Sequence, residues 1–314
     1  MRLNVVAWPL THVSPHPRPL SPGEGSLTGR ARGLGCARHD AHHGFFSGVE
    51  FRFWSIRFAE SVSEGTGAGP DLCHVLQLIH FLNRNYMFLG HFGVAFGAKT
   101  QQPRVSLGTL FLAAQLADLV WPTLLLLGVE RVNIVPHATA ANALDFVHYP
   151  FTHSLLAELV GGLLLGLLYW LVRRNAQGAL LVGLLVPSHW LLDLVVHTPD
   201  LPLYPGQSPL LGFGLWNHLA ITQVVELALL GWGLWVYMRH TQARNGVGRY
   251  GLLGLVAFLV LSHLASIFSP PPASVALIGW GGQLLWLPVL LAYWVDRNRE
   301  FIGEMRPASV PSTF

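Results

Sequence analysis

Six long apolar segments set the strongest limit on what this chain can fold into. A helix needs roughly 20 mostly apolar residues to cross a bilayer. Six segments meet this length, separated by short polar or proline-rich turns: 105–128, 154–172, 178–197, 219–238, 251–269 and 274–295. The apolar stretch 87–99 is too short to span, which predicts a half-helix or an interfacial helix. The sequence therefore predicts an all-α fold, a polytopic membrane bundle of six transmembrane helices with a short N-terminal half-helix.

The low content of charged residues also indicates a membrane environment. Only 11% of the residues are charged and 52% are hydrophobic, whereas a soluble domain carries roughly a quarter charged residues. The lipid bilayer is therefore the expected partner of this chain. The basic residues form no cluster of the kind that binds nucleic acid, which excludes that partner. Both cysteines, Cys36 and Cys73, precede the membrane body, so that body has no disulfide framework and no thiolate metal site.

The first 86 residues differ in character from the rest of the chain. They are rich in Pro, Gly, Ser and Arg, as in SPHPRPLSPGEGSLTGRARGLG, and bury too little apolar surface to offset their chain entropy. They also lack the apolar core and cleavage site of a signal peptide. We expect either a true start at Met87 or a genuine disordered extension. The predicted division is an extension over 1–86, a membrane domain over 87–297 and a cytoplasmic tail over 298–314.

Arginines gather in the loops on one side of the predicted spans. Counting spans puts seven of them on that side: Arg173, Arg174, Arg239, Arg244, Arg249, Arg297 and Arg299. Lys99 and Arg104 agree with this assignment, and Arg131 does not. The positive-inside rule makes this side cytoplasmic. We therefore predict a multi-pass protein of the bacterial inner membrane with a cytoplasmic C-terminus, and with 129–153, 198–218 and 270–273 on the other face.

Ionisable side chains interrupt the apolar segments. Asp118 lies in the first segment, and the third carries His189, Asp193 and His197 at spacing i, i+4, i+8, which puts them on one helix face. An aspartate at the centre of a membrane helix costs ~2.5–3.5 kcal/mol on insertion scales, so such residues indicate function. Imidazole and carboxylate are the usual ligands of zinc, manganese and non-haem iron. The stripe predicts a divalent metal site, for zinc by preference and manganese as the alternative.

A pair of histidines, His148 and His153, stands at the entrance to the second segment, in FVHYPFTHS. The predicted topology puts this pair at the same membrane face as the end of the third segment, which strengthens the metal interpretation. Two other interpretations stay open. The polar residues could form a hydrogen-bonded core that only fixes helix packing, or they could line a proton or ion path.

The order of these motifs resembles that of a known family. The strings GHFGVAFGAK, AQLADLVWP, HYPFTHSLL, SHWLLDLVVHTPDLPLYPG, GLWNH and VVELALLGWGLWVY are similar to those of the YdjM-like group of bacterial membrane proteins, predicted to be membrane-bound metal-dependent hydrolases. The similarity covers roughly 87–240. It implies functional roles for seven residues: His91, Asp118, His148, His153, Ser154, His189 and Asp193. Many members carry an arginine after the first histidine of the pair, where this chain has Tyr149. The group is similar in motif order to zinc phospholipases C and single-strand nucleases.

The predicted metal ligands, including His197, are enough for two ions with open coordination positions, as hydrolysis requires. For His91 the alternative is a snorkelling position at the interface. Asp145 is predicted to act as general base or as hydrogen-bond partner of an imidazole, with a solvated loop acid as the alternative. Ser154 fits a helix N-cap better than a nucleophile. The predicted rim of the site also includes Trp216 as an interfacial anchor, Asn217 and His218.

These expectations combine into a predicted function. The chain is expected to be a membrane-embedded, metal-dependent hydrolase whose site lies at the non-cytoplasmic interface. Its substrate would be a phosphoester or a lipid-like ester, such as a phospholipid, because that interface presents such groups. The alternative is a non-enzymatic membrane protein that binds metal or transports ions or protons.

Overall fold

The computed structural model describes residues 89–302. The predictions for the extension over 1–86, for a start at Met87 and for the end of the tail lie outside the described residues. The described part is built from helices, which are α3 (Leu89–Ala98), α4 (Leu107–Ala114), α5 (Leu116–Leu126), α6 (Leu155–Arg173), α7 (Ala176–Val196), α8 (Leu219–His240), α9 (Leu252–Phe268), α10 (Val275–Gly282) and α11 (Trp286–Arg297). Short turns of 3₁₀ or π geometry cover Leu215–Asn217, Val247–Gly251 and Gln283–Leu285.

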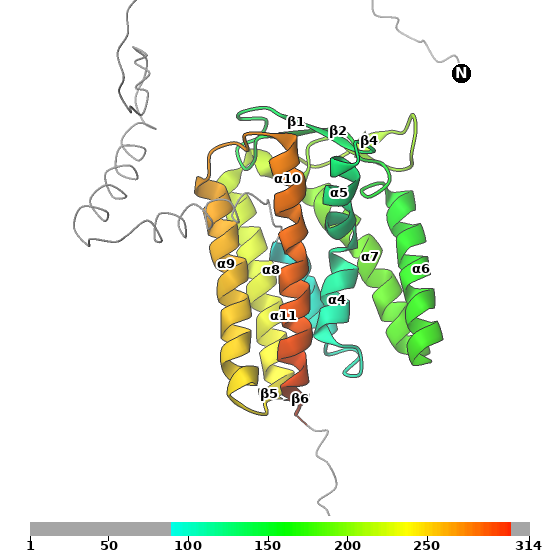
Figure 1. The fold of residues 1–314 in the computed structure, drawn as a ribbon, viewed down its shortest axis with the longest axis vertical. Coiled ribbons are helices and arrows are strands. Elements are labelled where there is room, and N and C mark those ends of the chain that lie inside the picture. The colour runs from blue at the N-terminus through cyan, green and yellow to red at the C-terminus, as the bar shows by residue number, and fades with distance from the viewer. Residues whose placement is uncertain (1–88, 303–314) are drawn as a thin grey trace, which may run out of the picture. The chain divides into compact units, whose positions relative to one another are not determined.

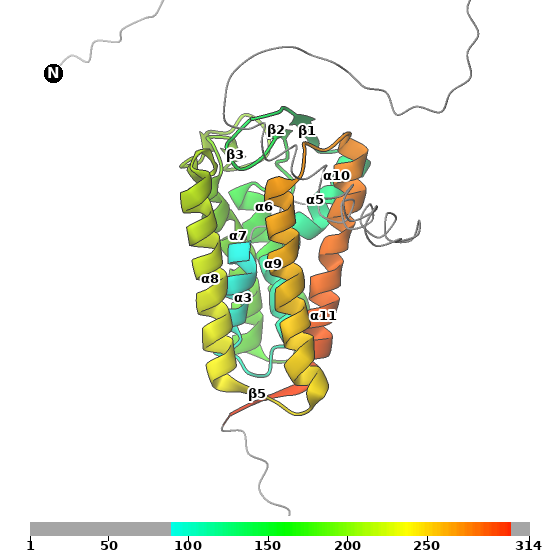
Figure 2. The ribbon, with the colours of Figure 1, turned by 90° about the vertical axis from the view of Figure 1, so that its left-hand side faces the viewer.

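The predicted helical membrane bundle is confirmed. Within 89–302, five helical stretches are long and apolar enough to cross a membrane, and the bent pair α4–α5 makes a sixth if it is one span. Figures 1 and 2 both show α9 beside α11, and Figure 1 shows α7 and α6 beyond α4. Many apolar side chains point away from the bundle; Leu163 and Val172 on α6 are 72% and 70% exposed. Such a surface suits lipid as the surrounding solvent.

The short helix α3 lies inside the bundle, in contact with α4, α7 and α8 (Figure 2). Glycines allow this position. A Cβ atom at Gly233 of α8 would overlap the carbonyl group of Gly93 on α3, so the two backbones touch without side chains between them. Phe92 and Phe96 then pack on Phe111 of α4 with ring centroids 4.8 and 5.0 Å apart. The predicted half-helix is therefore a core element, and it carries His91 into the interior.

A break at Gln115 bends the first span. Helices α4 and α5 meet there at 55°, and Gln115 has φ −115° and ψ 14°, outside the helical range. Ser106 caps the start of α4 by accepting a hydrogen bond from the amide of Thr109 at 3.2 Å. The bend turns α5 toward α10, against which it packs. As a result Asp118, in the first turn of α5, follows directly after the break.

Two hairpins cover one end of the bundle, which we name the cap end. Strands β1 (Arg131–Ile134) and β2 (Leu144–His148) pair antiparallel, with Val132 opposite Phe146, and β3 (Leu201–Pro202) pairs with β4 (Leu210–Leu211). Figure 1 shows these hairpins above α5 and α10. A small apolar core beneath them is formed by Trp121, Leu125, Val132, Leu144, Tyr149, Trp190, Leu201 and Ile278. The segments predicted as loops on this side therefore have structure of their own.

The opposite end, which we name the arginine end, is closed by a third two-stranded sheet, whose strands come from distant parts of the chain. Strand β5 (Thr241–Ala243) pairs with β6 (Arg299–Phe301), so the first residues of the predicted tail belong to the fold. Beside it, Lys99 donates to the carboxylate of Asp296 at 2.8 Å and to the carbonyl oxygen of Val105 at 2.7 Å. This buried lysine ties the end of α3 to α11.

Candidate metal centre

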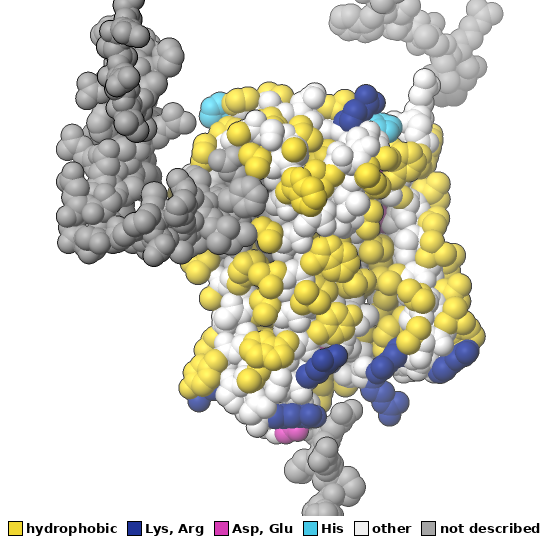
Figure 3. All heavy atoms as spheres, viewed as in Figure 1, with side chains coloured by type: hydrophobic (Ala, Val, Ile, Leu, Met, Phe, Trp, Pro, Cys, Tyr) yellow, Lys and Arg dark blue, Asp and Glu magenta, His cyan; other side chains and the backbone are white. Residues whose placement is uncertain are grey.

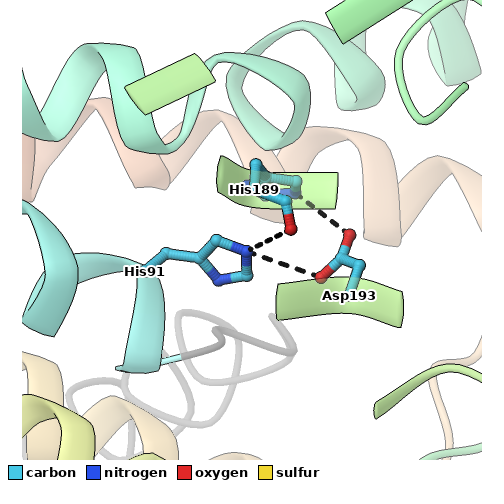
Figure 4. Close-up of side chains that lie close together, drawn as sticks. All are labelled: His91, His189 and Asp193. Carbon is cyan, nitrogen blue, oxygen red and sulfur yellow. Dashed lines mark hydrogen bonds and ion pairs between the residues drawn. The ribbon is translucent and has the colours of Figure 1, made fainter. Parts of the chain in front are cut away.

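Five predicted donors gather inside the bundle near the cap end. They come from three helices and one loop: His91 on α3, Asp118 on α5, His153 before α6, and His189 and Asp193 on α7. One ligand atom from each of His91, His189 and Asp193 lies within 4.8 Å of the others, and the same holds for Asp118, His153 and His189. Figure 4 shows the first group. These side chains could hold a metal ion, and His189 belongs to both groups.

Four of the donor atoms face one another closely. The Nε2 atom of His189 lies 3.2 Å from Oδ2 of Asp193 and 3.8 Å from Oδ1 of Asp118. The Nε2 atom of His153 lies 3.3 Å from Oδ1 of Asp118 and 3.9 Å from Oδ2 of Asp193. The side chain of Asp118 is 24% exposed, whereas the other three are at most 5% exposed. Asp118 is therefore the most exposed member of the cluster.

The tautomer of His189 follows from its second ring nitrogen. Nδ1 lies 2.9 Å from the carbonyl oxygen of Ala114, the last residue of α4. A carbonyl oxygen only accepts, so Nδ1 carries the hydrogen. In the neutral imidazole Nε2 then presents a lone pair toward the two aspartates.

The tautomer of His153 is set through Thr152 and Glu130. The hydroxyl of Thr152 donates its one hydrogen to Oε2 of Glu130 at 2.7 Å. It must therefore accept from Nδ1 of His153, which lies 2.7 Å away. Glu130 is buried and also accepts from the backbone amides of Phe151 and Thr152 at 2.8 and 3.0 Å. His153 consequently presents the Nε2 lone pair to Asp118, as His189 does.

Asp200 holds His197 in the same way. Nδ1 of His197 lies 2.9 Å from Oδ1 of Asp200, and its Nε2 lies 3.8 Å from Oδ2 of Asp193. Tyr149 donates to the same oxygen of Asp200 at 2.8 Å, and Thr198 donates to the other at 2.9 Å. Burial, and then the charge of Asp200, raise the pKa of the Tyr149 phenol well above its usual value. Tyr149 thus stays a hydrogen-bond donor throughout the physiological pH range.

These hydrogen bonds test whether the residues fit a cation. Three imidazoles have Nδ1 bound to an acceptor and turn Nε2 toward Asp118 or Asp193. Lone pairs on nitrogen and carboxylate oxygen repel unless a positive charge lies between them, which a metal ion or added protons can supply. Metal-binding histidines typically donate the other ring N–H to a carbonyl, carboxylate or similar acceptor. The donor set therefore fits a divalent cation.

His91 differs from the other three histidines. Its Nε2 lies 3.3 Å from the carbonyl oxygen of His189 and 3.5 Å from Oδ1 of Asp193. The carbonyl contact assigns the hydrogen to Nε2, so this atom donates toward both oxygens. The ring lies against that of His189, with centroids 3.9 Å apart, and is 1% exposed. His91 is therefore an interior residue that orients Asp193 and His189.

Other predicted site residues lie around this cluster. His148 ends β2, is half-buried and packs on Phe151 at 6.2 Å between ring centroids, outside both donor groups. Asp145 is exposed and accepts from the side chain of Asn133 at 3.2 Å, as a solvated loop acid would. Ser154 accepts from the amide of Ala157 at 3.2 Å and caps α6.

The three other residues predicted for the rim of the site occupy different environments. Trp216 packs on His197, with ring centroids 4.1 Å apart, and stacks on Phe146 at 6.0 Å. It thus covers the predicted ligand His197 rather than only anchoring the chain at the interface. Asn217 and His218 are exposed at the start of α8.

Three acidic residues stand out that the predicted site did not include. Glu130 and Asp200 support His153 and His197, as described above. Glu130 acts across 22 residues, so no local motif marks it, whereas Asp200 follows His197 by three residues and that spacing was an available signal. Glu158 on α6 is 2% exposed, and neither carboxylate oxygen has a hydrogen-bond partner among the described residues. Its position in an apolar span was the one available signal. Glu226 belongs elsewhere, because it accepts from the amide of Leu89 at 3.2 Å and lies 3.4 Å from His263.

Comparisons of the chain with family models, with curated proteins and with solved structures found no match.

Proposed function

We propose that this protein is a membrane-embedded, metal-dependent hydrolase. The observation that carries the proposal is the convergence of the Nε2 atoms of His153 and His189 on the carboxylates of Asp118 and Asp193. Both imidazoles have Nδ1 bound to an acceptor, which is how proteins orient histidine toward a metal.

These four side chains would hold the ion, with His197 beside them. Mixed imidazole and carboxylate donors favour zinc, with manganese as the alternative. When bound, a divalent cation supplies Lewis acidity toward an ester or phosphoryl oxygen and lowers the pKa of water toward ~7. The chain itself fixes the imidazoles through Ala114 and Thr152, and Asp118 is the one partly exposed donor.

The proposed substrate is an amphiphilic phosphoester or lipid-like ester. The position of the donors supports this, because they lie beneath the hairpins at the cap end of the apolar helices. Exposed apolar side chains, such as Phe151 and Leu156, flank the start of α6 at the same end. Insertion in the bacterial inner membrane with the arginine end in the cytoplasm is part of the proposal, and the arginine distribution supports it. The donors would then face the non-cytoplasmic side.

One observation favours a second function, ion or proton transport. Glu158 is buried in a span without a hydrogen-bond partner among the described residues, and unpaired intramembrane carboxylates are typical of proton relays. This function would also explain ionisable groups at several depths.

The first test is the metal content of the full-length protein, purified in detergent and measured by mass spectrometry. We expect near-stoichiometric zinc or manganese in the wild type and its loss in His189→Ala/Asp193→Ala. The matched control is His240→Ala/Glu300→Ala, which removes one exposed residue of each kind at the arginine end. A folded wild type that binds neither ion, with or without added metal, would overturn the proposal.

Activity is then assayed on bis-p-nitrophenyl phosphate and on a phospholipid in mixed micelles. We expect hydrolysis that a chelator stops and added zinc restores, and that Asp118→Asn abolishes. Stoichiometric metal without hydrolysis, together with proton flux in liposomes that Glu158→Gln stops, would replace the hydrolase by the transport function.

A further inference from the structure

A groove at the arginine end forms a second candidate binding site, separate from the donor cluster. It lies between α4, α6, α7 and α11 and has a cavity volume of about 490 Å³, within the range of ~300–1,000 Å³ typical of small-molecule sites. Val182 lines it from α7, two turns before His189 on the same helix. The groove therefore shares a helix with the candidate metal centre and opens at the other end of it.

Three arginines stand at the mouth of the groove, each from a different part of the chain. Arg104 precedes α4, Arg173 ends α6 and Arg297 ends α11. All three are exposed, and none has a carboxylate within salt-bridge distance among residues 89–302. Figure 3 shows Lys and Arg side chains gathered at this end of the molecule, below an apolar flank. Three uncompensated guanidinium groups around one opening favour an anion.

Other arginines at this end have partners of their own. Arg244 pairs with Glu300 at 3.1 Å, while Arg239 and Arg249 lie over the rings of Trp235 and Tyr250. The three arginines of the groove are therefore distinguished by their lack of partners as well as by their position.

The wall of the groove is apolar. Leu112, Leu165 and Val182 form its inner side, and Leu168 and Val172 form its edge on α6. These last two side chains are 56% and 70% exposed, so the groove opens on the apolar flank of α6 as well as at its end. The hydroxyls of Thr109 and Tyr293 lie 2.9 Å apart within it. The arginines at the mouth and the apolar side chains along the wall together match a molecule with an anionic head and an apolar tail.

The position of helix α6 suggests that a molecule bound in the groove would also support the bundle. It packs along α7 and has little direct contact with α4 or α11. An occupant of the groove would fill the space between α6 and α11 and join the outer helix pair to the rest of the bundle.

We propose that the groove binds an acidic glycerophospholipid from the surrounding leaflet. Arginine binds phosphate with charge-assisted, often bidentate hydrogen bonds, and basic sites between membrane helices on the cytoplasmic side commonly bind anionic headgroups. The apolar wall receives the first part of an acyl chain, and the exposed edge on α6 lets the remainder lie in the bilayer. A soluble phosphate compound would leave this wall in contact with water.

The test uses full-length, delipidated protein in detergent, with bound lipid counted by native mass spectrometry. The probes are dioleoyl phosphatidylglycerol, dioleoyl phosphatidylcholine, and glycerophosphoglycerol, which is the acidic headgroup without acyl chains. We expect one retained phosphatidylglycerol and a preference for it over phosphatidylcholine. Each arginine contributes about fivefold, from roughly 1 kcal/mol per basic residue near an acidic lipid. Glycerophosphoglycerol should not bind at the same concentration.

Variants locate the site. Arg104→Gln/Arg173→Gln/Arg297→Gln should lower the affinity for phosphatidylglycerol on the order of a hundredfold. The control, Arg239→Gln/Arg244→Gln/Arg249→Gln, removes the same charge at the same end and should change the affinity less than twofold. If the first variant fails to fold, Arg173→Gln alone carries the test at about fivefold, because its side chain is exposed.

Three results would overturn the proposal. Equal retention of the two lipids would show that charge is not recognised. Equal losses in the two triple variants would indicate general attraction to this end of the protein. Binding of glycerophosphoglycerol as tightly as the lipid would assign the groove to a soluble anion.

Discussion

Thr152→Val removes one hydroxyl and tests how His153 is oriented. Valine has nearly the shape of threonine, so the change removes chemistry more than volume. Two hydrogen bonds of 2.7 Å disappear, one from the hydroxyl to Glu130 and one from Nδ1 of His153 to the hydroxyl. Glu130 keeps its two backbone amide donors, so no carboxylate is left wholly unpaired.

The expected losses follow from these bonds. A hydrogen bond to a charged group contributes about 1.5–3 kcal/mol, so the free energy of unfolding should fall by roughly 2–3 kcal/mol. Without its acceptor at Nδ1, His153 can carry its hydrogen on Nε2, which no longer offers a lone pair to a cation. Loss of such a supporting hydrogen bond typically lowers metal affinity about 10–100-fold, or roughly 1.4–2.8 kcal/mol.

The assay is zinc affinity by competition with a chromophoric chelator, alongside thermal unfolding in detergent. Thr152→Ser keeps the hydroxyl and should recover most of the affinity. Thr222→Val is the matched control, because the Thr222 hydroxyl is equally buried but donates only to the backbone carbonyls of Leu215 and His218. Unchanged zinc affinity in Thr152→Val would refute the assignment of His153 Nε2 as a ligand.

Further predictions concern three other positions. Asp118→Asn should leave the fold intact, because the side chain is 24% exposed, but should weaken zinc binding at least tenfold; unchanged zinc content would count against this ligand. Tyr149→Phe tests the phenol of Tyr149, whose pKa is raised by burial and then by Asp200. The phenol should stabilise the fold only while it is protonated. Since the unfolded phenol ionises near pH ~10, the stability difference between wild type and Tyr149→Phe should be constant below that pH and shrink above it, in melts from pH 8 to 11. Gly233→Ala should lower the unfolding free energy by about 1–3 kcal/mol, because its Cβ would overlap the Gly93 carbonyl group, whereas Gly231→Ala on the same helix meets nothing within 4 Å and should be neutral or stabilising. Equal melting temperatures for the two alanine variants would contradict the close packing of α3 on α8.

The helices and the stripe on α7 could be predicted from the sequence because both depend on local properties. Apolar length determines what can span a bilayer, and the helical period puts His189, Asp193 and His197 on one face wherever the helix lies. The confirmed bundle and the N-cap at Ser154 belong to this class, since a helix and its cap involve residues a few positions apart.

Tertiary structure decided which of the remaining residues join the stripe. His148 and His153 look alike in sequence, yet β2 ends at one and the other turns inward beside Asp118. The hydrogen bonds that orient His153 cross from Glu130 to Thr152, 22 residues apart. The bend at Gln115 brings the carbonyl of Ala114 to His189, 75 residues away. Spacing along a chain cannot reveal such pairs, because their distance in space depends on how separate helices pack. That packing in turn depends on small features, such as the glycines at the contact between α3 and α8.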